Sequence, residues 1–158
     1  MIPRYAIYAR KSTESEDRQV LSIGSQLEEL RDLAARKGVA KPLELQESRS
    51  AKEPGRLVFN QLLRDVNRGR LDGIIAWKLD RLARNPVDGA ALIWALDQGK
   101  LQQIITPGMT YENLANDKMM MQFDFGIAKK YVDDLSDNVK RGNRAKLQLG
   151  WYPNRPPF

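Results

Sequence analysis

Four short apolar runs are spaced along the first two thirds of the chain, each separated from the next by polar residues. Each run is suited to a buried β-strand, and the run at residues 71–77 is the strongest while that at 43–45 is the weakest. We therefore expect strands at residues 5–9, 43–45, 71–77 and 101–106.

Between these runs, apolar residues recur at the three-to-four-residue spacing of a helix. Ser25 and Glu28 have the spacing of a capping box, which predicts that the first helix opens at Ser25. Asn85 followed by Pro86 is typical of an N-cap and a first helical residue. The three predicted helices begin at residue 25, about residue 56 and residue 86, and they end at Gly38, Gly69 and Gly99.

The alternation of strands and helices predicts an α/β fold, with a mainly parallel sheet flanked by helices. In such sheets ligands bind beyond the carboxyl ends of the strands. Ser12 follows the first strand, and residues 78–84 follow the third. If these two strands are neighbours, the two segments meet at one edge of the sheet.

From about residue 116 the pattern becomes one long helical repeat of roughly eight turns. Its apolar stripe is too long for one small domain to cover, which favours packing against a helix of a second copy. The alternative is that the first half of the helix packs on its own sheet and the rest frays. The stripe consists of Met120, Phe123, Ile127, Tyr131, Leu135 and Val139.

The amino-acid composition excludes several kinds of catalytic site. The chain has 158 residues, enough for one domain, with no histidine and no cysteine. Thiolate nucleophiles, Ser-His-Asp triads and zinc held by His or Cys are therefore excluded, whereas a carboxylate-bound magnesium site stays open. No run is long enough to span a membrane, and no signal peptide is evident, so the cytoplasm is the default location.

The net charge of +6 is concentrated at one end of the chain. Residues 138–158 contain five basic side chains and no acidic one, and so carry five of the six net charges. Such a block is typical of a nucleic-acid-binding arm, although a solvated tail has the same composition. The basic residues are Lys140, Arg141, Arg144, Lys146 and Arg155.

Two segments place arginines near a potential nucleophile. Arg10 and Ser12 are separated by one residue at the end of a strand, so both can project toward one site. Arg81 and Arg84 are three residues apart and share a face of a helical turn. Two guanidiniums repel unless an anion lies between them, and a phosphodiester matches their geometry. The alternative is an ion-paired cluster with Asp80 and no ligand.

In this order and spacing, the segments resemble the serine recombinases, a family that includes resolvases, invertases, large serine integrases and transposases. The resemblance covers nearly the whole chain, is most specific at residues 78–84, and is nearest to the large integrase and transposase branch. Tyr131 and Val132 depart from the Glu-Arg of small resolvases, so their dimer salt bridges are not transferred here. The matching segments are residues 8–13, 22–26, 78–84, 135–142 and 150–153, and the set Glu47, Ser50 and Arg56.

The resemblance implies that the Ser12 hydroxyl attacks a DNA phosphate and forms a 5′-phosphoserine, with neither metal nor cofactor. Arg10, Arg81 and Arg84 are then expected to hold the phosphate, with Arg56 next. Asp80 is expected to orient an arginine or to protonate the leaving oxygen. Expected supporting residues are Gln26, Glu47, Ser50 and Lys78, and expected DNA contacts are Lys140, Arg141, Arg144 and Lys146.

The family also implies partners and domains. Double-stranded DNA is the expected substrate, in integration, excision or transposition, with a homodimer that becomes a tetramer in the synaptic complex. We expect an α/β catalytic domain at 1–115 and a dimerising, DNA-contacting helix at 116–149. Residues 150–158 then begin a linker to DNA-reading domains that this chain lacks.

Three other functions remain open on the sequence. A metal-dependent nuclease could use Asp80 with Glu47 or Asp72. A DNA-binding or dimerisation module with degenerate chemistry would lack part of the site, yet the arginines and Ser12 are all present. A small-molecule α/β domain is disfavoured because no glycine-rich phosphate loop follows the first strand.

Overall fold

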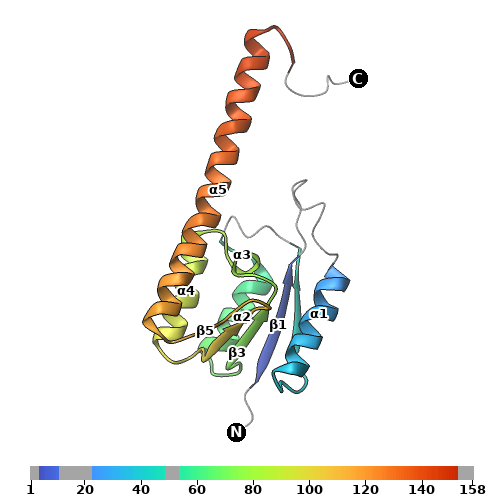
Figure 1. Cartoon of the computed structure of the whole chain (residues 1–158), viewed down its shortest axis with the longest axis vertical. Coiled ribbons are helices and arrows are strands. Elements are labelled where there is room, and N and C mark those ends of the chain that lie inside the picture. Colours follow the sequence, from blue (N-terminus) through green and yellow to red (C-terminus); the bar gives the residue numbers. More distant parts are fainter. Residues whose placement is uncertain (1–3, 11–22, 49–53, 153–158) are drawn as a thin grey trace.

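The described part of the chain forms an α/β body from which one long helix projects (Figure 1). The computed structural model describes residues 4–10, 23–48 and 54–152, apart from the side chain of Val132. Ser12 and Ser50 lie outside these ranges. Within the ranges, no helix is both long and apolar enough to cross a membrane.

The strands form one sheet in the order β2-β1-β3-β4-β5, in which the first four are parallel. This confirms the predicted fold class and makes the first and third strands neighbours. The last strand, which was not predicted, runs antiparallel to β4 after a turn at Pro107 and Gly108. The strands are β1 (Tyr5–Arg10), β2 (Leu43–Glu47), β3 (Gly73–Ala76), β4 (Gln103–Ile105) and β5 (Thr110–Glu112).

Four helices, α1, α2, α4 and α5, were predicted in the right places. The helical turn predicted for Arg81 and Arg84 is present as α3, but it ends at Leu82 and Ala83 is extended (φ −147°, ψ 139°), so the prediction that Arg84 shares this turn is wrong. The N-cap of α4 is confirmed, because Asn85 Oδ1 accepts a hydrogen bond from the Asp88 amide at 2.9 Å and Pro86 follows. The predicted start of α1 at Ser25 is wrong. The helix already includes Ile23, which packs against the buried residues between α1 and the sheet. The helices are α1 (Ile23–Arg36), α2 (Leu57–Asn67), α3 (Leu79–Leu82), α4 (Pro86–Asp97) and α5 (Ala115–Gln148).

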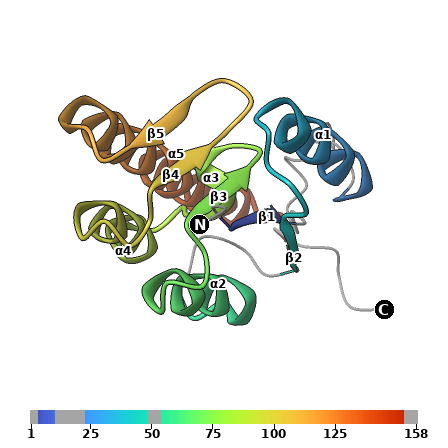
Figure 2. The same cartoon turned by 90° about the horizontal axis from the view of Figure 1, so that it is seen from below.

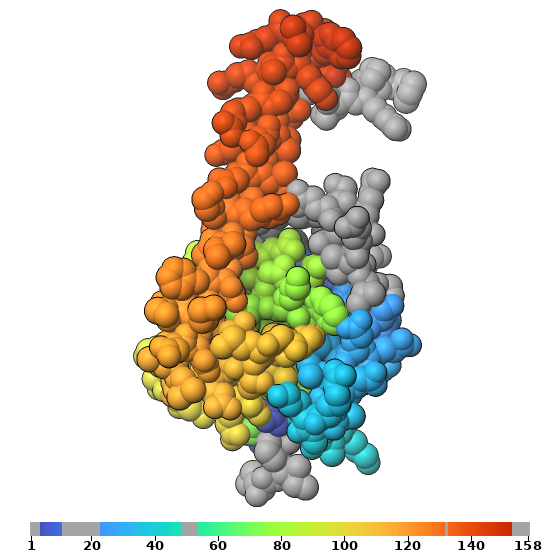
Figure 3. Space-filling view, viewed as in Figure 1, coloured from blue at the N-terminus to red at the C-terminus, as the bar shows by residue number. Residues whose placement is uncertain are grey.

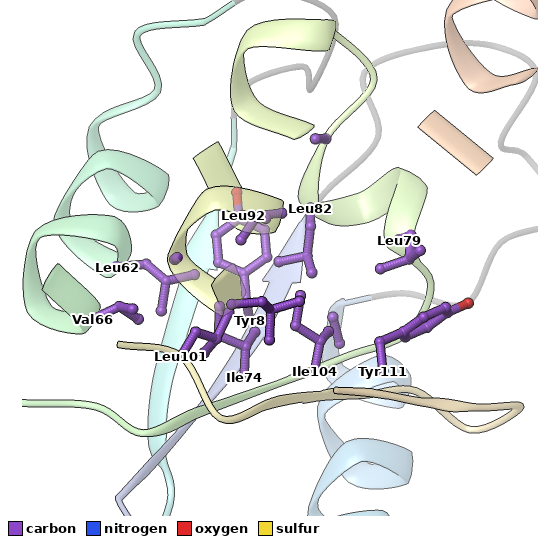
Figure 4. Packing of buried hydrophobic residues seen from close by; sticks show 14 of the residues in the cluster. Tyr8, Leu62, Val66, Ile74, Leu79, Leu82, Leu92, Leu101, Ile104 and Tyr111 are labelled. Atoms are coloured by element: carbon purple, nitrogen blue, oxygen red, sulfur yellow. The ribbon is translucent and has the colours of Figure 1, made fainter. Parts of the chain in front are cut away.

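Two apolar clusters cover the two faces of the sheet. Alternate residues of β1 point to opposite faces, so Tyr8 joins one cluster and Ile7 the other. Viewed along the sheet, α1 lies on one face while α2 and α4 lie on the other (Figure 2). Figure 4 shows the larger cluster, in which Leu62, Ile74 and Leu92 surround Tyr8. This double covering fixes β1 and β3, whose carboxyl ends lead into the candidate site.

The first turns of α5 pack on the body through Met121 and Phe125, which are buried. Gly89 in α4 permits this approach, because a Cβ there would lie 2.8 Å from the Phe125 ring. The helix has 34 residues and is therefore about 50 Å long, and its later turns stand clear of the body (Figure 3).

The first part of the predicted apolar stripe, Met120, Phe123 and Ile127, is on a different face of α5 from the residues that pack on the body, whereas Val139, five turns after Met121, is on the same face. Successive residues turn by about 100° around a helix, so Met120 and Met121 belong to separate faces. Of the stripe, only Leu135 is half-buried, while the side chains of the other five are exposed. The helix therefore packs on its own body without covering the stripe.

Candidate active site

The site lies where β1 and β3 end. The two strands pair in parallel, with Tyr8 opposite Ala76, so both carboxyl ends reach the same edge of the sheet. Arg10 is the last residue of β1, and α3 begins three residues after β3 ends. The predicted meeting of the two segments is thus confirmed for Arg10 and α3. Ser12 follows Arg10 by two residues.

Three arginines are concentrated at this edge. Arg10 and Arg81 are 1% and 3% exposed, and the Arg84 side chain is largely covered. Burial, followed by the positive charges of Arg84 and Arg81, lowers the pKa of Arg10 to about 10. The charge of Asp80 acts in the opposite direction. The three guanidiniums therefore lie close enough to repel one another.

Asp80 partly offsets this charge. Its Oδ2 accepts a hydrogen bond from Arg84 Nη2 at 3.2 Å, which is the local ion pair considered above. Its Oδ1 is shielded from solvent and has no hydrogen-bond partner in the part of the chain that the structure describes. The local ion pair is therefore present, and it lies beside the guanidiniums of Arg10 and Arg81.

A cleft of about 620 Å³ adjoins the arginines, between α3, the β4–β5 turn and α5. Lys78, Asp80 and Arg84 line one side, and Tyr111 and Tyr131 lie across from them. The Lys78 side chain is exposed at the start of α3. The sequence predicted the basic side of this cleft but not the aromatic side, since β5 was missed.

Arg56 lies apart from these arginines, in the core. It is 1% exposed and paired with Asp88, whose Oδ2 is 2.8 Å from Arg56 Nη2. Its Nη1 donates to the Tyr8 hydroxyl at 3.0 Å. Burial raises the pKa of Tyr8, so that hydroxyl stays neutral. The sequence grouped Arg56 with the phosphate-binding arginines, whereas its contacts in the structure are to protein groups.

Two of the expected supporting residues, Glu47 and Gln26, are buried. Glu47 is buried at the end of β2 and accepts hydrogen bonds from the amides of Ser48 and Val58, both at 3.1 Å. Because Val58 is in the first turn of α2, the carboxylate caps that helix. Gln26 is buried on α1.

The basic residues near the end of α5 are exposed and lie away from the body (Figure 1). Lys140, Arg141 and Arg144 line a shallow pocket together with Asp137. Lys140 approaches Asp137 at 3.9 Å, and Arg141 Nη2 donates to Asn138 Oδ1 at 2.7 Å. Lys146 is in the last turn, where a cation also interacts favourably with the helix dipole.

Of the two carboxylates considered as partners of Asp80 in a metal-nuclease site, Asp72 is separated from it. Asp72 precedes β3 and accepts a hydrogen bond from the Arg4 amide at 2.7 Å, whereas Asp80 follows β3, so the two lie at opposite ends of this strand. Glu47 ends β2 at the same end of the sheet as Asp80, but its carboxylate accepts hydrogen bonds from the Ser48 and Val58 amides. Among residues 4–10, 23–48 and 54–152, no three acidic side chains gather in a way that could hold a metal ion.

Asp88 is a residue that sequence reasoning missed. Its Oδ2 accepts hydrogen bonds from both Arg56 and Asn85 Nδ2, each at 2.8 Å. The spacing Asn85-x-x-Asp88 resembles a capping box and was a usable signal for the contact between these two residues. Nothing local in the sequence indicates the contact to Arg56, which is 32 residues away.

Comparison with known proteins gives one family match and several similar folds. The family model described as the resolvase N-terminal domain matches residues 5–152. No curated protein matches the chain.

Three solved structures are similar in fold. The N-terminal catalytic domain of TP901-1 integrase has 19% sequence identity and a TM-score of 0.59, covering 84% of this chain and 98% of that one. The C-terminal catalytic domain of ISC1926 TnpA, an IS607-like serine recombinase, has 18% identity and a TM-score of 0.56, with coverages of 90% and 85%. A serine recombinase from Sulfolobus solfataricus has 16% identity and a TM-score of 0.54, with coverages of 92% and 87%.

Proposed function

This chain belongs to the resolvase family and has the catalytic-domain fold of serine recombinases, which are DNA-cleaving enzymes, and we propose that Ser12 is its nucleophile. In this proposal the protein cuts and rejoins double-stranded DNA through a 5′-phosphoserine. The reaction is site-specific recombination, in integration, excision or transposition.

One observation carries the proposal. Arg10, Arg81 and Arg84 act on one another at the edge of the sheet, and Ser12 is two residues beyond Arg10. Two residues of chain span at most about 7 Å, so the backbone of Ser12 is tethered close to the arginine cluster. A nucleophilic hydroxyl beside several buried cations is an arrangement suited to attack on a phosphodiester.

Each step of the proposed reaction replaces one phosphoester bond by another. Ser12 Oγ forms a bond to phosphorus as the bond from phosphorus to the 3′ oxygen breaks. The serine proton passes to a base, and the 3′ oxygen takes up a proton to become a hydroxyl. Attack by a 3′-hydroxyl of another strand reverses these steps and releases the serine, so no nucleotide cofactor is consumed.

The arginines stabilise the charge that develops on the phosphoryl oxygens during both steps. A pKa of about 10 leaves Arg10 protonated at neutral pH, as this role requires. Arg81 and Arg84 offer planar guanidiniums that match phosphate oxygens in pairs. Asp80 either orients Arg84, to which it is already bonded, or gives a proton to the leaving oxygen.

Long helix α5 supplies the contacts to partners. Its exposed stripe is the surface through which we propose that two copies form a dimer, and two dimers form the synaptic tetramer. Its basic last turns, from Lys140 to Lys146, lie along the DNA backbone and contribute affinity that falls as salt rises.

Covalent capture tests this function. The protein is incubated with a pool of random-sequence duplex DNA and quenched with detergent, and DNA that stays bound to protein is counted. We expect the wild-type protein and Ser15→Ala to yield covalent DNA, and Ser12→Ala to yield none while it remains folded. Ser15 is a matched control because it lies in the same polar segment. Equal capture by Ser12→Ala would exclude the proposed nucleophile.

A further inference from the structure

Arg56 joins four parts of the fold through one buried guanidinium. Its Nη1 donates to the Tyr8 hydroxyl in β1 at 3.0 Å. Its Nη2 donates to the backbone oxygen of Leu82 in α3 and to Asp88 in α4. The guanidinium carbon also lies 4.1 Å from the centre of the Phe59 ring in α2. The group thus connects β1, which carries Arg10, with the segment from α3 to α4, which carries Arg81 and Arg84.

A contribution to stability does not by itself explain why the Arg56–Asp88 ion pair is buried in the core. Arg56 and Asp88 are 1% and 4% exposed, so both charges are removed from water. Replacing such a pair by apolar side chains of similar volume is often neutral or stabilising. An apolar pair cannot reproduce the hydrogen bonds from Arg56 to the Tyr8 hydroxyl and to the Leu82 carbonyl, and the second of these lies in the segment that carries the candidate catalytic arginines.

The Leu82 carbonyl lies at the end of α3, in the segment that carries Arg81 and Arg84. Helix α3 has only four residues, and a single turn is not stable by itself. The carbonyl groups at the end of a helix lack partners within it, and Arg56 satisfies the one of Leu82. Leu82 lies between Arg81 and Arg84, so this bond fixes the backbone from which both side chains project.

Asp88 holds the other end of the same segment. Its Oδ2 accepts a hydrogen bond from Asn85 Nδ2 at 2.8 Å, and its amide donates to Asn85 Oδ1 at 2.9 Å. Asn85 directly follows Arg84. The Arg56–Asp88 pair therefore anchors residues 82–85 on both sides of Arg84.

We propose that Arg56 and Asp88 are positioning residues, which orient Arg81 and Arg84 by holding residues 82–85, and that Arg56 does not contact the DNA phosphate. The role rests on the function proposed above for the two arginines. The competing role, in which Arg56 itself binds phosphate, requires it to leave Asp88, Tyr8 and Leu82.

A double replacement removes the link while keeping the core apolar. Arg56→Met with Asp88→Leu is expected to stay folded, because buried pairs tolerate such exchange. We expect covalent capture at saturating DNA to slow by about tenfold or more, since small misplacement of a catalytic group is costly. The DNA dissociation constant is expected to change less than about threefold. The matched control is Arg70→Met with Asp65→Leu, an ion pair at the far end of α2, which is expected to leave the rate unchanged.

A single replacement separates the two roles of Arg56. Asp88→Asn keeps the shape of the side chain but removes the charge that holds Arg56. If Arg56 is a positioning residue, Asp88→Asn also slows the capture. A wild-type rate in Asp88→Asn, or loss of DNA affinity in Arg56→Met by more than about tenfold, would overturn the proposal.

A third readout does not depend on catalysis. The Nε–Hε resonances of Arg81 and Arg84 report the surroundings of their guanidiniums in a nitrogen-15 NMR spectrum. We expect them to shift in the Arg56→Met, Asp88→Leu protein and not in the control. Unchanged resonances refute the positioning role. If the wild-type protein captures no DNA, the proposed function fails, and the spectrum still decides whether residues 82–85 depend on this pair.

Discussion

Single arginines determine what the site can bind. Arg10 is fully buried beside two other cations, and its lowered pKa shows that the charged form is disfavoured in the folded protein. Under the proposed function, the DNA phosphate relieves this repulsion, so the stability of the free protein and its function are opposed at this residue.

Replacing Arg10 by Met tests this opposition. Because the folded protein lowers the pKa of Arg10, its charge costs stability at every pH below about 10, and the cost is relieved as pH rises through that value. We expect Arg10→Met to raise the free energy of unfolding by on the order of 1 kcal/mol at pH 7. Covalent capture is expected to fall by about 100-fold or more. Urea unfolding measures the first effect, and a destabilised variant would contradict the account.

The sequence predicted the site residues in part. Arg10, Arg81 and Arg84 could be placed together because strand ends in a parallel sheet share an edge. The position of Arg56 could not be predicted, because its partners Tyr8 and Asp88 are far from it in sequence. A buried arginine and a phosphate-binding arginine look alike until the fold shows what each one touches.

At the scale of elements, regular repeats were predictable and short pieces were not. The three-to-four-residue repeat located α5, which extends from Ala115 to Gln148. By contrast, β5 has three residues and follows a turn, which is too short for any repeat to be recognised. The missed strand matters because Tyr111 at its centre lines the cleft beside Arg84. The start of α1 was misplaced, since the helix includes Ile23, whose packing on the core a local capping signal does not reveal.

The two faces of α5 predict different effects of mutation. Phe123 is 59% exposed, on the stripe that we propose to form the dimer and outside the residues that line the cleft. A buried carboxylate in an apolar interface is costly, so Phe123→Glu is expected to weaken self-association by at least about tenfold. Gln122→Glu adds the same charge on another exposed face of the helix and is expected to leave association unchanged. Sedimentation velocity measures both variants, and a wild-type dimer that tolerates Phe123→Glu would show that the stripe is not the interface.

At the scale of the whole molecule, the proposed chemistry and the proposed contacts with partners are assigned to two parts of the chain. The α/β body holds the buried arginine cluster, while the projecting helix carries the exposed stripe and ends in a basic segment (Figure 1). The two parts meet at the cleft, which Ile127 and Tyr131 of the stripe line together with Arg84. The central claim is that the reacting atom in that site is the hydroxyl of Ser12.

Mapping the covalent bond tests this claim most directly. Captured DNA is digested to a short nucleotide remnant, and the protein is cleaved with trypsin, which releases residues 12–18 as one peptide. Fragmentation by mass spectrometry distinguishes Ser12 from Thr13 and Ser15 within it. The account predicts a nucleotide joined through its 5′-phosphate to Ser12. A remnant on another residue, or one joined through a 3′-phosphate, would contradict it.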